Sequence, residues 1–142
     1  MSGSTQRSVH DNLVYGFTVD CERKRIVLYT EFRDGEAEEY TDVIFGGALA
    51  HHFQDVLASN ILFGIEEVDV EKAVQEWKQR FVEGRPYGWP EGVEYREIGE
   101  LVTALRERGL KSFYISSSYG MGGFVLAREM RISARESKAE LQ

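Results

Sequence analysis

The sequence predicts an α+β fold: a single-domain antiparallel β-sheet, formed by an N-terminal meander and a C-terminal hairpin, with two α-helices packed on one face. Period-two alternation of apolar residues, typical of half-buried strands, recurs between residues 13 and 45 of the 142 residues. Two segments with apolar residues at helical spacing follow, and a pair of strands comes last. This order lacks a regular β-α-β alternation, which argues against the parallel α/β classes.

The N-terminal third is expected to form a three-stranded antiparallel meander. Alternating residues predict strands over 13–20, 25–32 and 38–45, with a polar turn at 20–24 between the first two. Asp34-Gly35 is a strong hairpin signal, because a type I′ turn needs positive φ and glycine adopts it without steric cost. These three strands pair in sequence order in the predicted sheet.

The segment 48–57 is compatible with two structures. One face of a helix would hold Leu49, Phe53, Val56 and Leu57, whereas one face of a strand would hold Leu49, His51 and Phe53. Both alternatives stay open, and the choice between them decides where the histidines point. After a turn at Ser59-Asn60, residues 61–68 predict another strand.

Two helices are predicted in the middle of the chain. Asp69 is a typical N-cap for the first, whose apolar residues recur up to Phe81 and which ends at Gly84. The second is expected over 95–108, with Gly109 as the residue that ends it. The segment 85–90 between them is predicted as a loop.

The C-terminal part predicts a β-hairpin. Strands are expected over 111–117 and 124–132, joined by the glycine-rich turn 119–123. Residues 1–8 and 133–142 are expected to be loose tails. A chain of this length fits one domain over residues 1–142.

The charge balance restricts the classes of partner. The net charge of −7 arises from 24 acidic and 17 basic residues, which argues against nucleic-acid binding and favours a basic protein as partner. No apolar run reaches the ~20 residues that span a bilayer and no signal-peptide core is visible, so no membrane partner is expected and the cytoplasm is the default location. Exposed sheet edges leave a homodimer as an alternative.

No catalytic, cofactor or metal site is predicted. Cys21 is the only cysteine, and the carboxylates of Asp20 and Glu22 beside it disfavour a thiolate. The serines at 116–118 lack the Gly-x-Ser-x-Gly pattern of a hydrolase, and no zinc-type spacing of cysteine and histidine exists. The sequence therefore favours a non-enzymatic protein over an enzyme and leaves the question open.

Two groups of residues are candidates for a site. Tyr87, Trp89 and Tyr95 flank Pro86 and Pro90 in the predicted loop and suit a contact with a protein partner, because Tyr and Trp dominate interface energies. Trp89 folded back onto the core is the competing interpretation. The second group would line a pocket between sheet and helices, binding a small ligand or hydrolysing one: His51, His52, Ser116, Ser118 and Tyr119.

Three segments, 43–53, 60–68 and 113–127, resemble small uncharacterised bacterial α+β domains of unknown function, some of them thought of as immunity-type or accessory proteins. The closing Ser-Tyr-Gly…Gly-Phe-Val-Leu-Ala segment carries most of this resemblance. It implies a bacterial source and a compact single-domain fold, and no catalytic motif accompanies it. The leading hypothesis is a cytoplasmic, non-enzymatic protein-binding module.

Overall fold

A computed structural model describes residues 8–34, 37–90 and 92–141. Within these residues, eight antiparallel strands form one sheet in the order β4-β7-β6-β5-β1-β2-β3-β8, together with three α-helices and one short 3₁₀ helix. The elements are β1 (Leu13–Asp20), β2 (Arg25–Asp34), β3 (Ala37–Gly46), β4 (Ala50–Gln54), β5 (Asn60–Val68), α1 (Val70–Glu76), α2 (Lys78–Gly84), η1 (Arg85–Tyr87), α3 (Ile98–Glu107), β6 (Lys111–Tyr119), β7 (Gly122–Ala127) and β8 (Glu129–Arg135).

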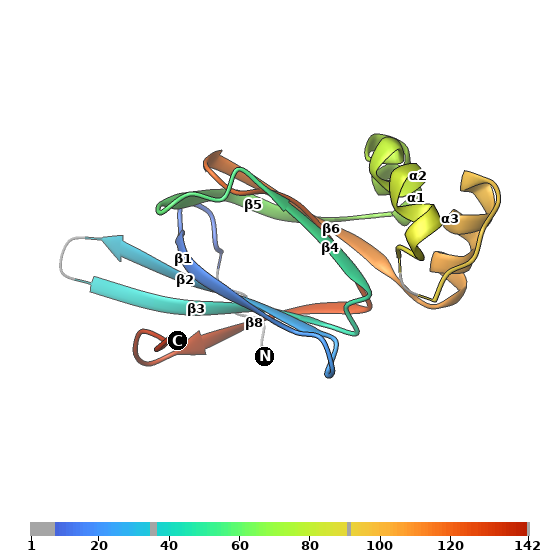
Figure 1. Cartoon of the computed structure of the whole chain (residues 1–142). Coiled ribbons are helices and arrows are strands. Elements are labelled where there is room, and N and C mark those ends of the chain that lie inside the picture. The colour runs from blue at the N-terminus through green and yellow to red at the C-terminus, as the bar shows by residue number, and fades with distance from the viewer. Residues whose placement is uncertain (1–7, 35–36, 91, 142) are drawn as a thin grey trace.

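The sheet folds over on itself into two layers, one containing β4, β5 and β6 and the other β1, β2, β3 and β8 (Figure 1). β5 and β1 join the layers through only two residue pairs, Leu13 with Ile61 and Val14 with Asn60. On the other side the chain runs directly from β7 into β8. The first core lies between the layers, and its largest buried side chains include Phe45, Phe113, Ile26, Leu28 and Leu62.

The helices lie at one end of the sheet and make a second core against its outward face (Figure 1). Phe124 of β7 is fully buried there, with its ring stacked on Phe81 of α2 at a centroid distance of 5.8 Å. Leu101 and Leu105 of α3 are also fully buried in this core. Removal of this apolar surface from water fixes the position of the helices on the sheet.

The predicted meander is confirmed. β1, β2 and β3 pair antiparallel in sequence order, and β2 and β3 stay in register from Arg25 with Gly46 to Asp34 with Ala37. The turn predicted at Asp34-Gly35 falls partly on residues 35–36, which lie outside the described residues. The coarse prediction of an antiparallel sheet with helices on one side is therefore correct.

The prediction of two helices is wrong, because the first one is interrupted. Trp77, with φ −107° and ψ 25°, leaves the helical conformation and separates α1 from α2. The break lets the Trp77 ring reach His52 and Phe124, at centroid distances of 5.0 and 5.4 Å. The last helix begins at Ile98 rather than 95, because Glu97 and Glu100 form a capping box there.

The C-terminal strand also differs from its prediction. The expected strand 124–132 is two strands, because the chain passes from one layer to the other at Arg128, whose N–H donates to the Gly46 carbonyl at 3.0 Å. β8 continues to Arg135 and pairs with β3. The expected loose tail instead packs on β1, where the Ala139 N–H donates to the Tyr15 hydroxyl at 2.9 Å.

The ambiguous segment 48–57 contains β4, which pairs with β7 from Ala50 with Leu126 to Gln54 with Gly122. Among the described residues, no helix is both long and apolar enough to cross a membrane.

Candidate functional site

An exposed tyrosine stands on a short turn after α2. Residues 84–90, called the aromatic turn below, include η1 and are closed by two backbone hydrogen bonds. The Gly88 N–H donates to the Arg85 carbonyl at 3.1 Å, and the Trp89 N–H donates to the Gly84 carbonyl at 3.0 Å. Gly88 adopts φ 76°, which glycine reaches without strain. Tyr87, the middle residue of this turn, is 88% exposed.

Trp89 anchors the aromatic turn to the second core. Its ring lies 4.9 Å from the Phe81 ring, and the Arg80 guanidinium covers it at 4.2 Å from the ring centroid. Gly84 permits the close approach, since a Cβ there would lie only 3.0 Å from Trp89 atoms. Trp89 is thus folded back on the core, although part of its ring remains accessible.

Tyr95 does not reach the surface, because its ring fills the core beside Phe81. It is 6% exposed, and its hydroxyl donates to the Phe81 carbonyl at 2.8 Å. Its own carbonyl accepts a hydrogen bond from Arg85 Nε at 2.5 Å. Burial raises the pKa of the Tyr95 hydroxyl. Tyr95 therefore holds the aromatic turn in place and offers no contact to a partner.

Acidic side chains surround the start of α3, next to the aromatic turn. An open groove of about 700 Å³ separates the two, with Glu94 and Glu100 on its wall. Glu97, Glu100 and Glu107 line the adjoining outer surface of α3. None of these four carboxylates belongs to an ion pair within the described part of the chain, whereas the neighbouring Arg106 is paired with Asp69 at 2.5 Å.

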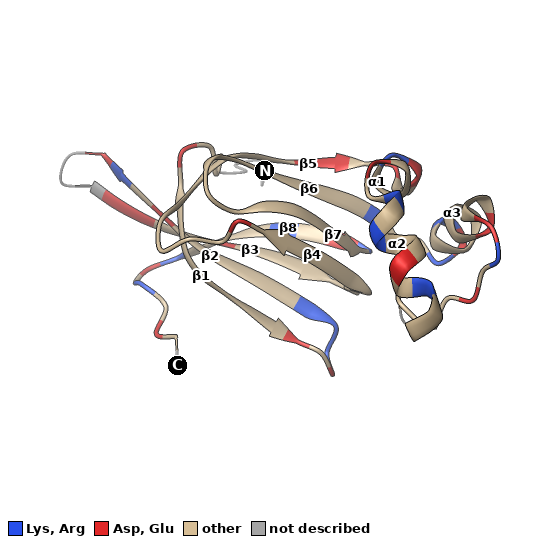
Figure 2. Ribbon diagram, turned by 45° about the horizontal axis from the view of Figure 1, so that its top comes forward, with Lys and Arg blue, Asp and Glu red and all other residues tan. Residues whose placement is uncertain are grey.

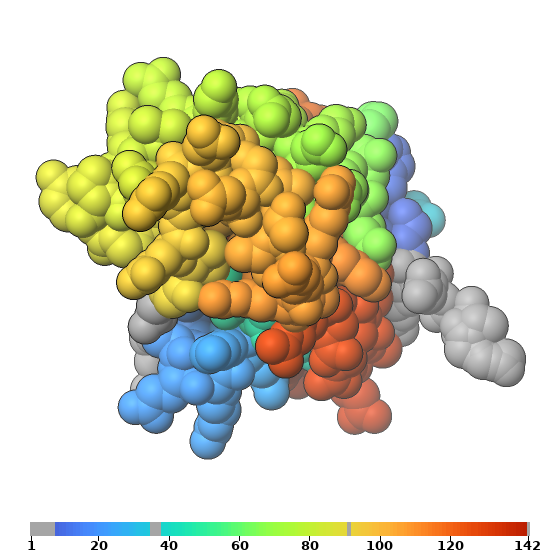
Figure 3. All heavy atoms as spheres, turned by 90° about the vertical axis from the view of Figure 1, so that its right-hand side faces the viewer, coloured from blue at the N-terminus to red at the C-terminus, as the bar shows by residue number. Residues whose placement is uncertain are grey.

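Figure 3 looks onto this side of the molecule, with α3 in orange at the centre and the yellow aromatic turn standing out at the left edge. The groove wall also carries Arg85 and Arg96, of which Arg85 is bound to the Tyr95 carbonyl. Pro86 and Gly88, on either side of Tyr87, thus line one groove with Glu94 and Glu100.

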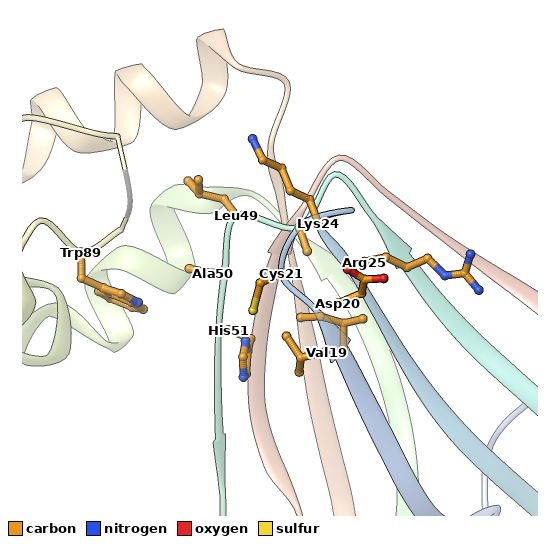
Figure 4. Close-up of a pocket in the computed structure, with 11 residues that line it drawn as sticks. Val19, Asp20, Cys21, Lys24, Arg25, Leu49, Ala50, His51 and Trp89 are labelled. Atoms are coloured by element: carbon orange, nitrogen blue, oxygen red, sulfur yellow. The ribbon is translucent and has the colours of Figure 1, made fainter. Parts of the chain in front are cut away.

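A second concave site, called the corner pocket below, lies where the β1–β2 turn meets β4. It has a volume of about 230 Å³. The His51 ring, the Cys21 thiol and the Trp89 ring point into it, while the charged ends of Lys24 and Arg25 point away (Figure 4). Burial lowers the pKa of His51, and the charge of His52 acts in the same direction. The pocket therefore presents a neutral imidazole at pH 7.

The other residues expected beside His51 lie elsewhere. His52 points to the opposite face of β4 and packs against Trp77 and Phe124, because successive side chains of a strand alternate. Ser116, Ser118 and Tyr119 are exposed near the far end of β6, where Tyr119 pairs with Ile61. The five residues thus do not share one pocket. Sequence reasoning missed Cys21 as a neighbour of His51, because only the long-range fold brings the β1–β2 turn to β4.

The lowered pKa of His51 predicts a pH dependence of stability. A histidine whose folded pKa lies below its unfolded value of about 6.5 makes the unfolded state bind more protons, so stability is lost as the pH falls below that value. We expect His51→Gln to flatten the decline in free energy of unfolding between pH 7 and pH 5. Urea unfolding across this range measures it, and equal slopes for both proteins would contradict it.

Among the described residues, no group of three or more His, Cys, Asp and Glu side chains is arranged to hold a metal ion. No family of known proteins, no curated protein and no solved structure matches this chain.

Proposed function

We propose that this protein is a non-enzymatic binding module for a basic protein, similar in role to the immunity-type or accessory proteins found among the domains that its sequence resembles. The observation that carries the proposal is Tyr87, 88% exposed on a turn whose neighbouring residues are fixed in the core. Tyrosine side chains on rigid supports are the typical anchors of protein interfaces, because they bury much surface at a small entropy cost.

The rigidity of the aromatic turn supports this role. Trp89 and Tyr95 hold it from two sides through the contacts described above, and its own hydrogen bonds close it. A partner therefore meets Tyr87 in a fixed position and spends little free energy on ordering the loop.

The charge of the adjoining surface supports a basic partner. Glu94, Glu97, Glu100 and Glu107 lie in no ion pair within the described residues, and these four carboxylates outnumber Arg85 and Arg96 of the groove wall, so the surface carries an excess of negative charge. Complementary charges of this kind accelerate encounter and fix orientation, and their effect falls as salt concentration rises.

A second candidate function is binding of a small ligand in the corner pocket. The half-buried His51 and the Trp89 ring, which both line this pocket, favour it, because convergent polar and aromatic side chains are typical of ligand sites. A hydrolytic function has no such support, since Ser116 and Ser118 lie far from His51 along the sheet. The surface around Tyr87 remains the stronger candidate.

Replacement of Tyr87 by alanine is expected to weaken binding of the partner about tenfold or more without changing the melting temperature. A contact residue of this type contributes at least about 1.4 kcal/mol, whereas its exposed ring stabilises the free protein little. The partner is first identified by native mass spectrometry of complexes from the host lysate, and its affinity is then measured by calorimetry. Tyr119→Ala, which removes a tyrosine 57% exposed at another place, is the matched control.

The same titrations test the charge of the surface. Glu94→Lys with Glu107→Lys is expected to weaken binding and to reduce its salt dependence, while Glu39→Lys with Glu140→Lys changes the net charge equally at other places on the chain. An unchanged affinity of Tyr87→Ala, with an unchanged melting temperature, would overturn the proposed contact surface.

Trp89→Ala is expected to lose about 2–3 kcal/mol of stability instead, because it leaves a cavity in the core beside Phe81.

A further inference from the structure

A small pocket of about 120 Å³ lies where the β1–β2 turn, the chain after β3, the end of α3 and the chain between β7 and β8 come together. In Figure 3 the blue β1–β2 turn, the orange end of α3 and the red chain after β7 meet below the centre of the view. We call it the basic pocket, because the three charged residues that line it are all cations. The residues that line it are Lys24, Gly47, Leu49, Arg108, Leu110 and Arg128.

The three cations of the basic pocket have no counter-charge among the described residues. Lys24, Arg108 and Arg128 belong to no ion pair there. The carboxylates next to two of them in sequence lie elsewhere: Glu107 lines the outer surface of α3, and the Glu129 side chain lies over β3. Figure 2 shows basic segments, in blue, in the β1–β2 turn and near the end of α3. Like charges around one small pocket repel one another, and an anion between them would relieve this repulsion.

Contacts with the rest of the chain position the three cations. The Lys24 carbonyl accepts a hydrogen bond at 2.8 Å from the chain after β3, and the charged end of Lys24 points away from the corner pocket (Figure 4). Arg108 Nη2 donates to the Gly92 carbonyl at 2.7 Å. The Arg128 stem lies over Gly47, where an added Cβ would come within 3.0 Å of its Cγ and Cδ atoms. Both arginines are therefore positioned before a ligand arrives, which lowers the entropy cost of binding.

We propose that the basic pocket binds a phosphate group, either as the free anion or as a phosphate monoester. A guanidinium presents a planar fork of N–H donors to a pair of phosphate oxygens, and an ammonium group adds a point charge. Cations from three segments of the chain suit a dianion with three free oxygens better than a carboxylate, which has one charge and two oxygens. The volume admits one such group, since it lies well below the ~300 Å³ at which pockets for drug-sized ligands begin.

This proposal is separate from the proposed partner surface. The basic pocket contains neither Tyr87 nor any of the four unpaired glutamates beside it, so either proposal can fail without the other. It adjoins the corner pocket, with which it shares Lys24 and Leu49, but the His51 ring and the Cys21 thiol point into the corner pocket alone.

The test titrates sodium phosphate into the isotope-labelled full-length protein and follows amide shifts by NMR, with chloride keeping the ionic strength constant. We expect saturable shifts at Gly47, Gly109 and Arg128, with a Kd on the order of 1 mM. Arg128→Gln is expected to weaken binding about fivefold, because an exposed ion pair makes a modest contribution. Arg131→Gln, which removes the same charge from an exposed position on β8, is the matched control and should bind as the wild type does.

A second variant keeps the test decisive if Arg128→Gln alters the chain around it. Lys24→Gln is also expected to weaken binding about fivefold, and Lys78→Gln at an exposed position on α2 is its matched control. The double variant of Lys24 and Arg128 is expected to show no saturation. Arg108 is left in place, because its guanidinium also holds the Gly92 carbonyl.

Two further probes separate the sources of the phosphate group. Tighter binding of N-acetyl-O-phospho-L-serine methylamide than of inorganic phosphate indicates a phosphorylated protein side chain, and the reverse order indicates a free phosphate. The same serine compound without its phosphate is expected not to bind. No saturation by either phosphate compound up to about 20 mM, equal affinity of the wild type and both single variants, or equal binding of the unphosphorylated compound would overturn the proposal.

Discussion

Gly123→Ala is expected to lower the free energy of unfolding by more than about 4 kcal/mol, or to prevent folding. Gly123 has φ 134°, a backbone conformation that side chains rarely permit. An added Cβ would also collide with the His52 carbonyl of β4. Gly123 pairs with Phe53 on one side and Ile115 on the other, so the sheet cannot shift to make room without losing both ladders. Losses of this size belong to a few severe mechanisms, of which backbone strain is one.

Urea unfolding followed by circular dichroism measures this loss. Gly64→Ala on β5 is the matched control, because a Cβ at Gly64 would meet no atom within 4 Å. Its free energy of unfolding is expected to stay within about 0.5 kcal/mol of the wild type. Equal stability of the two variants would show that β4 and β7 are not paired as described.

Phe124→Ala is expected to cost about 3–5 kcal/mol, the range typical of emptied aromatic core positions. The Phe124 ring is fully buried and contacts Phe81 of α2, Trp77 between the helices and His52 of β4. It is therefore a side chain that joins the helices to the sheet. Its removal leaves a cavity between the helices and the outward face of the sheet.

The measurement is again urea unfolding, with Phe63→Ala as control. Phe63 is 62% exposed on β5, so its loss is expected to cost under about 1 kcal/mol. Phe124→Leu keeps most of the volume and should recover more than half of the lost stability. A small effect of Phe124→Ala would contradict the position of the helices on this face.

The sequence predicts the parts of the fold that local pattern controls. The meander follows from period-two alternation and turn chemistry, both of which act between near neighbours. The local sequence does not decide between helix and strand for segment 48–57, since Leu49 and Phe53 fit one face of either. Its conformation is decided by pairing with β7, more than seventy residues along the chain at Ala50 with Leu126.

Two boundaries were mispredicted because tertiary contacts override a continuous pattern. The apolar spacing from Val70 to Phe81 predicts one helix, yet Trp77 leaves the helix to fill the core above Phe124. The run 124–132 reads as one strand, yet Arg128 carries the chain from one layer to the other. The sequence around Trp77 and Arg128 indicates neither the helix break nor the change of layer.

The sequence likewise predicts one part of the candidate site and misses another. A proline- and glycine-rich loop with aromatic residues predicts exposure, and Tyr87 is exposed. Tyr95 lies in the core, where its hydroxyl donates to the Phe81 carbonyl, a contact between distant residues that the local sequence does not indicate. His51 and His52 are separated by strand alternation, which followed from the sequence only once β4 was known to be a strand.

The most direct test of the binding surface is amide hydrogen exchange on the free protein and on its complex with the captured partner. The proposed contact predicts slower exchange in the complex at residues 85–89 and along the exposed side of α3, with little change elsewhere among the described residues. Protection confined to the corner pocket, or to the edges β4 and β8, with unchanged exchange around Tyr87, would contradict it.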